Sequence, residues 1–569
     1  MVQLQLVRRF SFIGLIALVA CDETADADFD TVFRSGQTFD VTELSDHPLD
    51  GSAEPCECKS TRPDEACTLR AAVEAANACI GHDTIVLTVA GNYELDIHSA
   101  PGGDAGASEG DLDILDAVTI RAQLEPFVSA TVVAKFPSGK EHRLFDVHPK
   151  AEFARFESFR MMGGVMDPDV WGPDSNGGCL RTTESDTTLY SMVVGGEPQD
   201  GCQGWFGGGV FADGGQLTLQ STIVGGGQTL FFTEWQTSGS GGGVGASGAR
   251  VSIEGSTLIG NESIGVGGGL YTTGGSVTVI DTDIVENLAT NIGGGGYLAS
   301  PFFVKDSVVN YNDATDGSSL GGGGLLLQHP SAEDAVVLGT EVAHNGANRG
   351  GGITVDGAAT IVGSDIHHNV AGDEGGGVAA WNGSSVRIDE SSLHGNRSHR
   401  GAGVFVAEGS EVSATNSTFV ENEATDDGGG AFVAVDGVLA LLHATVRLNV
   451  AADHAGGVSS LGFTQLDRSI LLENSQSAGP ADCDGTVASA GFSMLDAASC
   501  ASSGASDVLG SPFGWGVPGY HAPGDTYSIP LLTGNVGLSA VEGCGVDIDQ
   551  RGVGREEVCD IGAFEGPEA

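Results

Sequence analysis

Basic side chains are scarce in this chain: Lys and Arg number 24 against 76 Asp and Glu, for a formal net charge of −52 at pH 7. Aromatic residues make up only 6% of the 569 residues. A surface with such an excess of negative charge repels phosphate backbones and anionic lipid headgroups. The composition therefore excludes nucleic acid as an expected partner, and it excludes attachment to a membrane surface through charge.

Long hydrophobic runs are also lacking near the N-terminus. The apolar stretch 10–20 follows Arg8 and Arg9 and is too short to span a bilayer, so residues 1–20 are predicted to be a signal peptide. The stretch ends Leu18-Val19-Ala20-Cys21, which resembles a bacterial lipobox, where the cysteine is diacylated. Dual acylation is enough for stable anchoring. We therefore expect Cys21 to carry the lipid and to be the chain's only link to a membrane.

The predicted lipoprotein would lie at the outer membrane or the cell surface. Asp22 resembles an inner-membrane retention signal of enteric bacteria, which leaves inner-membrane retention as the alternative. Residues 21–55 are acidic and poor in periodic apolar residues, so they are predicted to form a tether between the lipid and the folded part.

Ten cysteines remain besides Cys21, an even number that favours disulfides in an exported chain. Zinc is the alternative, but no group shows two C-x-x-C arms or a flanking histidine pair. Cys56 and Cys58 are too close to bridge each other without strain, so each should pair with Cys67 or Cys79. The other expected pairs are Cys179–Cys202, Cys483–Cys500 and Cys544–Cys559.

A glycine run followed by an apolar strand recurs every 25 to 28 residues. The runs end at Gly243, Gly269, Gly296, Gly324, Gly352, Gly377, Gly403, Gly430 and Gly457. A period of this length indicates stacked units that share one continuous core. Each unit has a strand after the glycines, a second strand after a small turn, and a third, Ser/Thr-rich strand that closes on asparagine. Three short strands per coil of ~27 residues predict an all-β fold, a parallel β-helix.

The closing asparagines recur with the same period. On coils stacked about 4.8 Å apart, their amides would bond to one another above and below. We therefore predict a structural ladder of Asn261, Asn287, Asn312, Asn345, Asn369, Asn396, Asn422 and Asn449.

The ends of the chain depart from the repeat. Residues 68–78 carry the one clear helical pattern, which predicts a helical cap over the open end of the array. We divide the rest into an N-terminal cap with the first coils at 56–206, regular repeats at 207–480, and a disulfide-pinned C-terminal cap at 481–569.

Motifs at both ends resemble a family of exported bacterial proteins. Residues 67–73 (CTLRAAV) are similar to the CSLREA signature, and Gly110-Asp111-Leu112-Asp113-Ile114 matches a segment that follows it. Residues 549–553 and 560–565 resemble the closing signature of choice-of-anchor Q type surface proteins. The resemblance implies a right-handed, pectate-lyase-like β-helix on a bacterial surface, without a settled activity. The repeats also resemble those of polymorphic outer-membrane proteins, through Phe419-Val420-Glu421-Asn422.

Candidate chemistry is sparse. β-Helices host polysaccharide lyases and hydrolases, which need clustered carboxylates or a basic residue beside calcium. Lys305 is the only lysine of the array, and no acidic cluster recurs in adjacent coils, so no catalytic residue and no cofactor are expected. Adjacent coils would bring His344 near His368, with His367 and His394 one residue earlier in the unit. This spacing could hold a metal, but solvated surface histidines are the favoured interpretation, so no metal is predicted.

Two classes of function follow. An insert between Gly209 and Gly243 contains Phe231, Phe232 and Trp235, which would either stack on sugar rings or cover a coil edge. The favoured hypothesis is a lipid-anchored, monomeric, non-catalytic adhesin or display protein that binds extracellular polysaccharide or another cell surface. The alternative is a polysaccharide lyase or glycoside hydrolase on the same fold.

Overall fold

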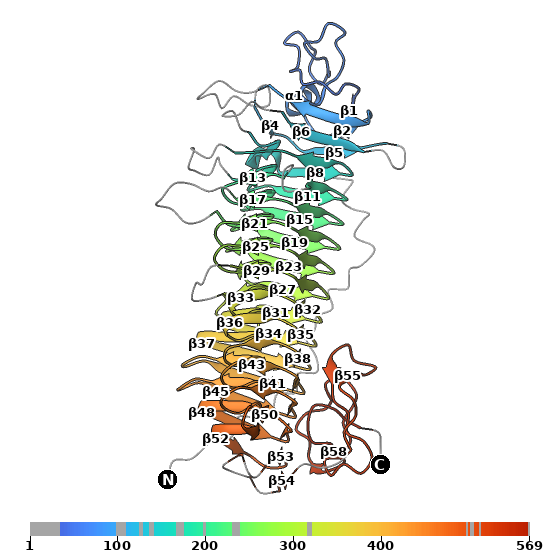
Figure 1. The fold of residues 1–569 in the computed structure, drawn as a ribbon. Helices are drawn as coiled ribbons and strands as arrows, with labels where there is room; N and C mark the ends of the chain where they lie inside the picture. The colour runs from blue at the N-terminus through green and yellow to red at the C-terminus, as the bar shows by residue number, and fades with distance from the viewer. Residues whose placement is uncertain are drawn as a thin grey trace, which may run out of the picture.

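Stacked coils form a long column, with the N-terminal coils at one end and the C-terminal coils at the other (Figure 1). The computed structural model describes residues 35–97, 110–124, 129–135, 142–166, 176–196, 201–229, 239–315, 321–496, 499–500, 504, 506–510 and 514–566. Strands of successive coils pair in parallel and build three main sheets, of 26, 16 and 12 strands, here called sheets 1, 2 and 3. The predicted parallel β-helix is confirmed.

One coil illustrates the repeat. β22 (Leu270–Thr273) and β23 (Ser276–Ile280) belong to sheet 1, β24 (Asp283–Val285) to sheet 2 and β25 (Leu288–Ala289) to sheet 3. Buried and partly exposed residues alternate along β23, so its valines enter the core. The two-residue strands of sheet 3 could not be predicted from the sequence, because two residues are too few to show an alternation of apolar and polar side chains.

The periodic glycines are required where sheet 3 turns into sheet 1. Gly267 has a φ of +65°, and a Cβ on Gly268 would lie 2.3 Å from the carbonyl oxygen of Gly294 in the next coil. Neighbouring backbones therefore approach too closely for a side chain. This contact explains why the run returns once per coil.

The asparagine ladder runs through the core between sheets 2 and 3. Each of the eight predicted asparagines donates from Nδ2 to Oδ1 of the next one at 2.9–3.1 Å. The ladder continues through Asn474 to Asp482, whose carboxylate accepts from Asn474. Burial raises the pKa of Asp482 to about 6.

A second ladder, absent from the sequence predictions, lies between sheets 1 and 2. In most coils the backbone N–H of a Ser or Thr donates to the hydroxyl of its counterpart one coil on, as from Thr222 to Ser256 at 3.1 Å and from Thr282 to Ser307 at 3.2 Å. The series is interrupted at Ala444, which has no hydroxyl. Both ladders supply hydrogen-bond partners to buried backbone groups at the corners, where strand pairing does not reach.

The N-terminal end is closed by α1 (Leu69–Ala78), as predicted. The side chain of Thr68 caps the helix by accepting from the backbone N–H of Ala71 at 3.2 Å. Inside the cap the buried guanidinium of Arg70 donates to Asp46 at 2.6 Å.

The predicted tether over residues 21–55 is too long. β1 (Ser35–Val41) pairs in parallel with β2 (His82–Leu87) and belongs to sheet 1. Phe39 and Val41 are buried, so the apolar residues of this stretch enter the core. This strand could not be predicted from the sequence, because it lies outside the repeat and its few apolar residues are surrounded by acidic ones.

Five disulfides link neighbouring segments of the chain. They pair Cys56 with Cys79, Cys58 with Cys67, Cys179 with Cys202, Cys483 with Cys500, and Cys544 with Cys559. All lie within the clusters named from the sequence, and they indicate an exported protein. Among the residues that the structure describes, no helix is both long and apolar enough to cross a membrane.

The expected C-terminal cap divides into two parts. β52 (Cys483–Ser489), β53 (Met494–Leu495) and β54 (Val508–Leu509) continue sheets 1 and 2 and end the column. Residues 514–566, here called the flank segment, instead lie beside the last coils (Figure 1). The flank segment contains β55 (Gly519–Tyr520), β56 (Tyr527–Ser528), β57 (Val541–Glu542) and β58 (Val558–Cys559).

The flank segment is held on sheet 2 by apolar and polar contacts. Ile470 and Leu472, on the outer face of β49 (Ile470–Leu472), share a buried cluster with Leu531 and Val541. Gln550 accepts from Thr418 Oγ1 at 2.5 Å and donates to the carbonyl of Ser391 at 3.3 Å. The residues that resemble a closing signature thus dock the flank segment on the column.

Candidate functional site

Four histidines gather on the outer surface beside the edge of the flank segment, on consecutive coils. We call the group of His344, His367, His368 and His394 the histidine corner. His367 and His394 end the strands β35 (Asp365–His367) and β38 (Ser392–His394) of sheet 2. His344 and His368 occupy the next turn position, with φ of +56° and +54°.

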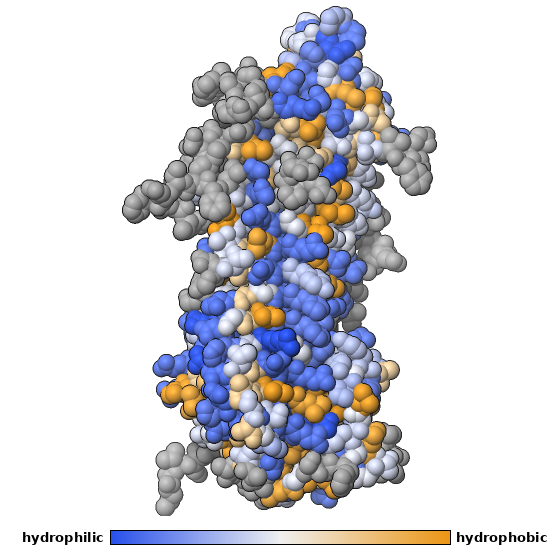
Figure 2. Space-filling view, viewed as in Figure 1, coloured by the Kyte–Doolittle hydropathy of each residue, from blue (hydrophilic) through white to orange (hydrophobic). Residues whose placement is uncertain are grey.

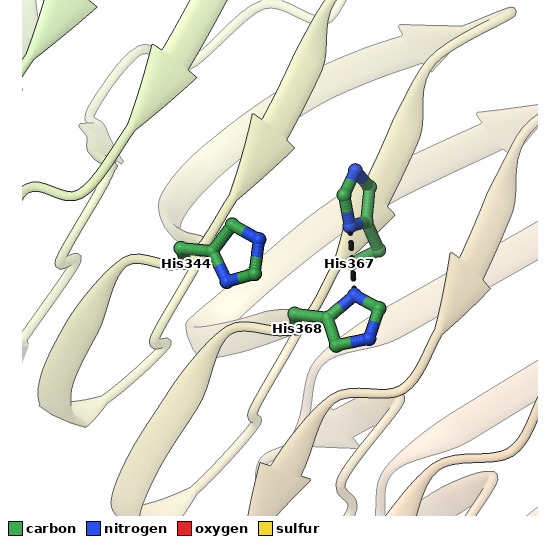
Figure 3. Close-up of side chains that lie close together, drawn as sticks. All are labelled: His344, His367 and His368. Carbon is green, nitrogen blue, oxygen red and sulfur yellow. Dashed lines mark hydrogen bonds between the residues drawn. The ribbon is translucent and has the colours of Figure 1, made fainter.

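In-register stacking of the coils brings these rings together. The rings of His344 and His368 stack at 5.2 Å, and those of His367 and His394 at 4.8 Å. The Nδ1 atoms of His367 and His368 face each other at 2.9 Å, with His344 alongside on the neighbouring coil (Figure 3). The predicted proximity of His344 and His368 is therefore found, together with a third imidazole.

Asp365 connects the histidine corner to the flank segment. Its carboxylate accepts a hydrogen bond from Tyr520 Oη at 2.7 Å and another from Ser392. His394 Nε2 lies 3.1 Å from Asp365 Oδ1, and the ring of Tyr527 stacks on His394 at 4.2 Å. Tyr520 and Tyr527 could not be assigned to this site from the sequence because they follow it by more than a hundred residues.

The protonation states follow from these surroundings. Burial lowers the pKa of both His367 and His368, which favours neutral rings with free lone pairs. Burial opposes ionisation of Asp365, but hydrogen bonding to His394 and its charge hold the pKa of Asp365 below its ordinary value. Burial, together with the bond to Asp365, raises the pKa of Tyr520. The group therefore combines neutral imidazoles with a fixed carboxylate.

A shallow open groove of about 470 Å³ lies on sheet 3, one corner away from these rings. It crosses β29 (Asp313–Ala314), β33 (Gly346–Arg349) and β36 (Val370–Glu374). The residues lining it are Asp313, Ala314, Thr315, Gly346, Ala347, Asn348, Val370 and Gly372.

Two glycines leave this groove open. A Cβ on Gly346 would lie 3.1 Å from Asp313 Oδ1, and one on Gly372 would lie 3.0 Å from Asn348 Oδ1. Neither glycine has a positive φ, so the backbone itself would accept a side chain. The glycines thus expose a carboxylate and an amide to a ligand that lies across three coils. Hydrophilic residues cover much of the face seen in Figure 2, with small, scattered hydrophobic patches.

A charged network lies on sheet 1 near the N-terminal end. Arg143 Nε is 2.9 Å from Asp111 Oδ2, and His148 Nε2 is 2.7 Å from Asp113 Oδ1. Arg181 pairs with Asp146, which Arg143 also approaches. Burial raises the pKa of Asp111 to about 6, while the hydrogen bond to Asp113 raises the pKa of His148.

Beside this network is a pocket of about 210 Å³, lined by His148, Pro149, Asn176, Arg181, Thr183, Phe211 and Asp213. In the sequence, Asp111 and Asp113 stand out only as part of a motif. Their partners could not be recognised, because the coils between 110 and 210 are longer than the later ones and unequal in length, so no period aligns them.

Several expected site residues lie elsewhere. Cys21 and the aromatic insert with Phe231, Phe232 and Trp235 fall outside the described residues. Lys305 pairs with the adjacent Asp306 at 3.0 Å on the surface.

Among the comparisons with known proteins, one family model supports the β-helix fold. The family described as the right-handed beta helix region matches residues 299–466. A search of curated proteins finds no match. Among solved structures, pectate lyase Pel9A is 12% identical over 94% of this chain and 97% of its own, with a TM-score of 0.29. The Dettilon tailspike protein is 9% identical over 84% and 73%, with a TM-score of 0.28. The A-module of Azotobacter vinelandii mannuronan C-5 epimerase AlgE6 is 13% identical over 83% and 98%, with a TM-score of 0.21. Similarities this distant transfer no activity.

Proposed function

We propose that this chain is an exported, lipid-anchored β-helix protein that holds a polysaccharide without cleaving it. The observation that carries the proposal is the groove on sheet 3, which two glycines keep open beneath Asp313 and Asn348. Carboxylate and amide groups hydrogen-bond the hydroxyls of sugars, and Val370 adds an apolar edge on the same surface. Because the groove crosses three coils, an extended ligand meets similar backbone positions at each step.

The charge selects the class of ligand. A net charge of −52 disfavours acidic polysaccharides, so the groove suits neutral or amino-sugar chains. The lipobox at Cys21 and the resemblance to choice-of-anchor proteins support display on the outer membrane or cell surface.

The test is retention on a panel of immobilised polysaccharides, with simultaneous assay of released sugar ends. We expect retention by wild type and a loss of about tenfold or more in affinity for Gly372→Leu, which fills the groove. The control is Thr425→Leu, which lies outside the groove. Val370 pairs with Arg397 of β39 (Arg397–Ser398), and Arg397 pairs with Glu423 of β43 (Glu423–Ala424), so Thr425, just after β43, is the counterpart of Gly372 two coils further on. Absence of retention, or equal retention by both variants, would overturn the proposal.

A second candidate function rests on the charged network near the N-terminal end. The Asp111 carboxyl, with a pKa of about 6, suits a general acid, and Arg181, which lines the neighbouring pocket, suits the carboxylate of a uronic acid. Release of sugar ends that Asp111→Asn abolishes, and that Asn348→Ala leaves intact, would favour a lyase or hydrolase over the binding protein.

A further inference from the structure

We propose that His344, His367 and His368 bind one divalent transition-metal ion of the class that prefers imidazole, such as Zn²⁺, Co²⁺, Ni²⁺ or Cu²⁺. Each residue offers one ring nitrogen, and these three atoms lie within 4.8 Å of one another. Zinc binds histidine nitrogen at about 2.0–2.1 Å, so two nitrogens bound to one ion lie roughly 3–3.5 Å apart. Small ring rotations therefore convert the observed arrangement into a coordination sphere.

The facing nitrogens of His367 and His368 are the first support. Their Nδ1 atoms lie 2.9 Å apart and point toward each other (Figure 3). Without an ion, one of these two Nδ1 atoms donates its proton to the other in a hydrogen bond. An ion that takes the place of this proton accepts both lone pairs. His344 reaches the same place from the neighbouring coil, because its ring stacks on that of His368.

Carboxylates behind the ring of His367 are the second, independent support. His367 Nε2 lies 3.4 Å from Glu341 Oε1 and 3.9 Å from Asp365 Oδ2. Histidines that bind metals usually donate their other N–H to a carboxylate, which fixes the tautomer and orients the ring. Asp365 is itself held by Tyr520 Oη at 2.7 Å, so this support is rigid.

The donor set also selects the ion. Three nitrogen ligands disfavour Ca²⁺ and Mg²⁺, which require oxygen. His344 and His368 are exposed, which leaves further coordination positions to water or to a ligand's oxygen. The excess negative charge of the chain raises the local concentration of cations.

A neighbouring set, Asp365, His367 and His394, shares one histidine with the proposed site. We assign the ion to the outer set because the ring of Tyr527 stacks against His394 at 4.2 Å, and because Asp365 already accepts bonds from Ser392 and Tyr520. The assignment is independent of polysaccharide binding.

The experiment titrates the purified exported chain with Zn²⁺ by calorimetry and with Co²⁺ by visible absorption, in a non-chelating buffer. We expect one equivalent to bind, and His344→Gln and His368→Gln each to weaken binding by about 100-fold or more. The matched control is His399→Gln, an exposed histidine outside the corner that lies 3.4 Å from Asp426. The Zn²⁺ affinity of the His399→Gln variant should stay within about twofold of wild type, because His399 does not touch the ion.

A second measurement needs no variant. Zn²⁺ should protect His344, His367 and His368 of the wild-type chain from acylation by diethyl pyrocarbonate, mapped by peptide, and leave His399 reactive. The assignment is overturned if wild type binds no ion, or if His344→Gln binds as tightly as the control. Loss of binding in His394→Gln with full binding in His344→Gln would also overturn it, because the ion would then occupy the Asp365 set.

Discussion

The outer face of sheet 2 differs between the middle coils and the last coils of the column, although the asparagine ladder behind it does not. Over the last coils it faces the flank segment and carries Thr418, Thr445 and Ile470, all buried. Over the middle coils it faces solvent and carries the exposed Asp283 and the partly exposed Glu341. The asparagine ladder runs unbroken behind the two regions.

This comparison separates two roles within one repeat. Inward positions and ladder residues make each coil stack on the next, whatever lies outside. Outward positions determine what the column touches, and the histidine corner lies where the covered face meets the open one. If this division holds, changes on the covered face release the flank segment alone, while changes in a ladder damage either region equally.

The largest effect is expected from Arg555→Met in the flank segment. The buried Arg555 Nη1 lies 2.8 Å from Glu565 Oε2, and Nη2 donates to Asn416 Oδ1 at 2.9 Å. The substitution leaves Glu565 buried without its cation, at a cost of about 3–5 kcal/mol. Peptide-resolved hydrogen exchange should show loss of protection in 514–566 and in the strands beneath it, with 270–310 unchanged. Loss along the whole column would contradict the separation.

Acid should have a comparable effect through His443. Its Nε2 lies 2.7 Å from the carbonyl oxygen of Cys544, and burial lowers the pKa of His443 to about 3, with Arg555 and Arg468 adding positive charge nearby. Below pH ~6.5 the unfolded state binds this proton first, so stability is full above that pH and declines as pH falls toward 3, by up to about 1.4 kcal/mol per pH unit.

The measurement for His443 is the urea midpoint of the flank transition between pH 7 and pH 4. His443→Phe should flatten that dependence, because the side chain then has no proton to gain. A dependence as steep in the variant as in wild type would assign the acid sensitivity to other groups.

Periodic features of this molecule were predictable, and features outside the period were not. The ladder from Asn261 to Asn449 follows from spacing alone because each coil meets only its neighbours. The cap α1 follows from a local pattern at residues 68–78. In contrast, Gln550 bonds Thr418 across 132 residues, and no spacing rule encodes such a contact.

The histidine corner shows both cases in one site. The nearness of His344 and His368 follows from their equivalent positions in adjacent units. The bond between Tyr520 and Asp365 joins residues 155 apart, so the carboxylate that organises the corner could not be recognised. The charged network could not be recognised for a different reason, because the coils before residue 210 are unequal in length and no period aligns its residues.

An effect of similar size is expected from the asparagine ladder. In Asn396→Leu, the N–H and Nδ2 of Asn369 lose their acceptor, at about 1–3 kcal/mol for each unsatisfied group. Asn287→Leu, on a coil with an open outer face, should cost the same. The control Asn382→Ser removes one exposed bond to Asp356 and should stay within about 0.5 kcal/mol. Unequal losses at Asn396 and Asn287 would mean that the flank segment supports the core.

The smallest effect is expected from Arg397→Gln, which removes a similar arginine–glutamate ion pair that is exposed to solvent. Arg397 Nη2 is 2.7 Å from Glu423 Oε2, almost the distance of the Arg555 pair, but the two side chains are 67% and 51% exposed. Water already solvates both charged groups, so Arg397→Gln should lower the free energy of unfolding by less than about 0.5 kcal/mol. The loss should be smaller still in 1 M salt, which screens the pair. The measurement is the urea midpoint of both arginine variants in low and high salt. Because Arg555 also donates to Asn416 and to the carbonyls of Ile548, Asp560 and Gly562, the difference between the two variants reports burial together with these bonds. A cost at Arg397 equal to that at Arg555 would show that cover by the flank segment is not what makes its ion pair strong.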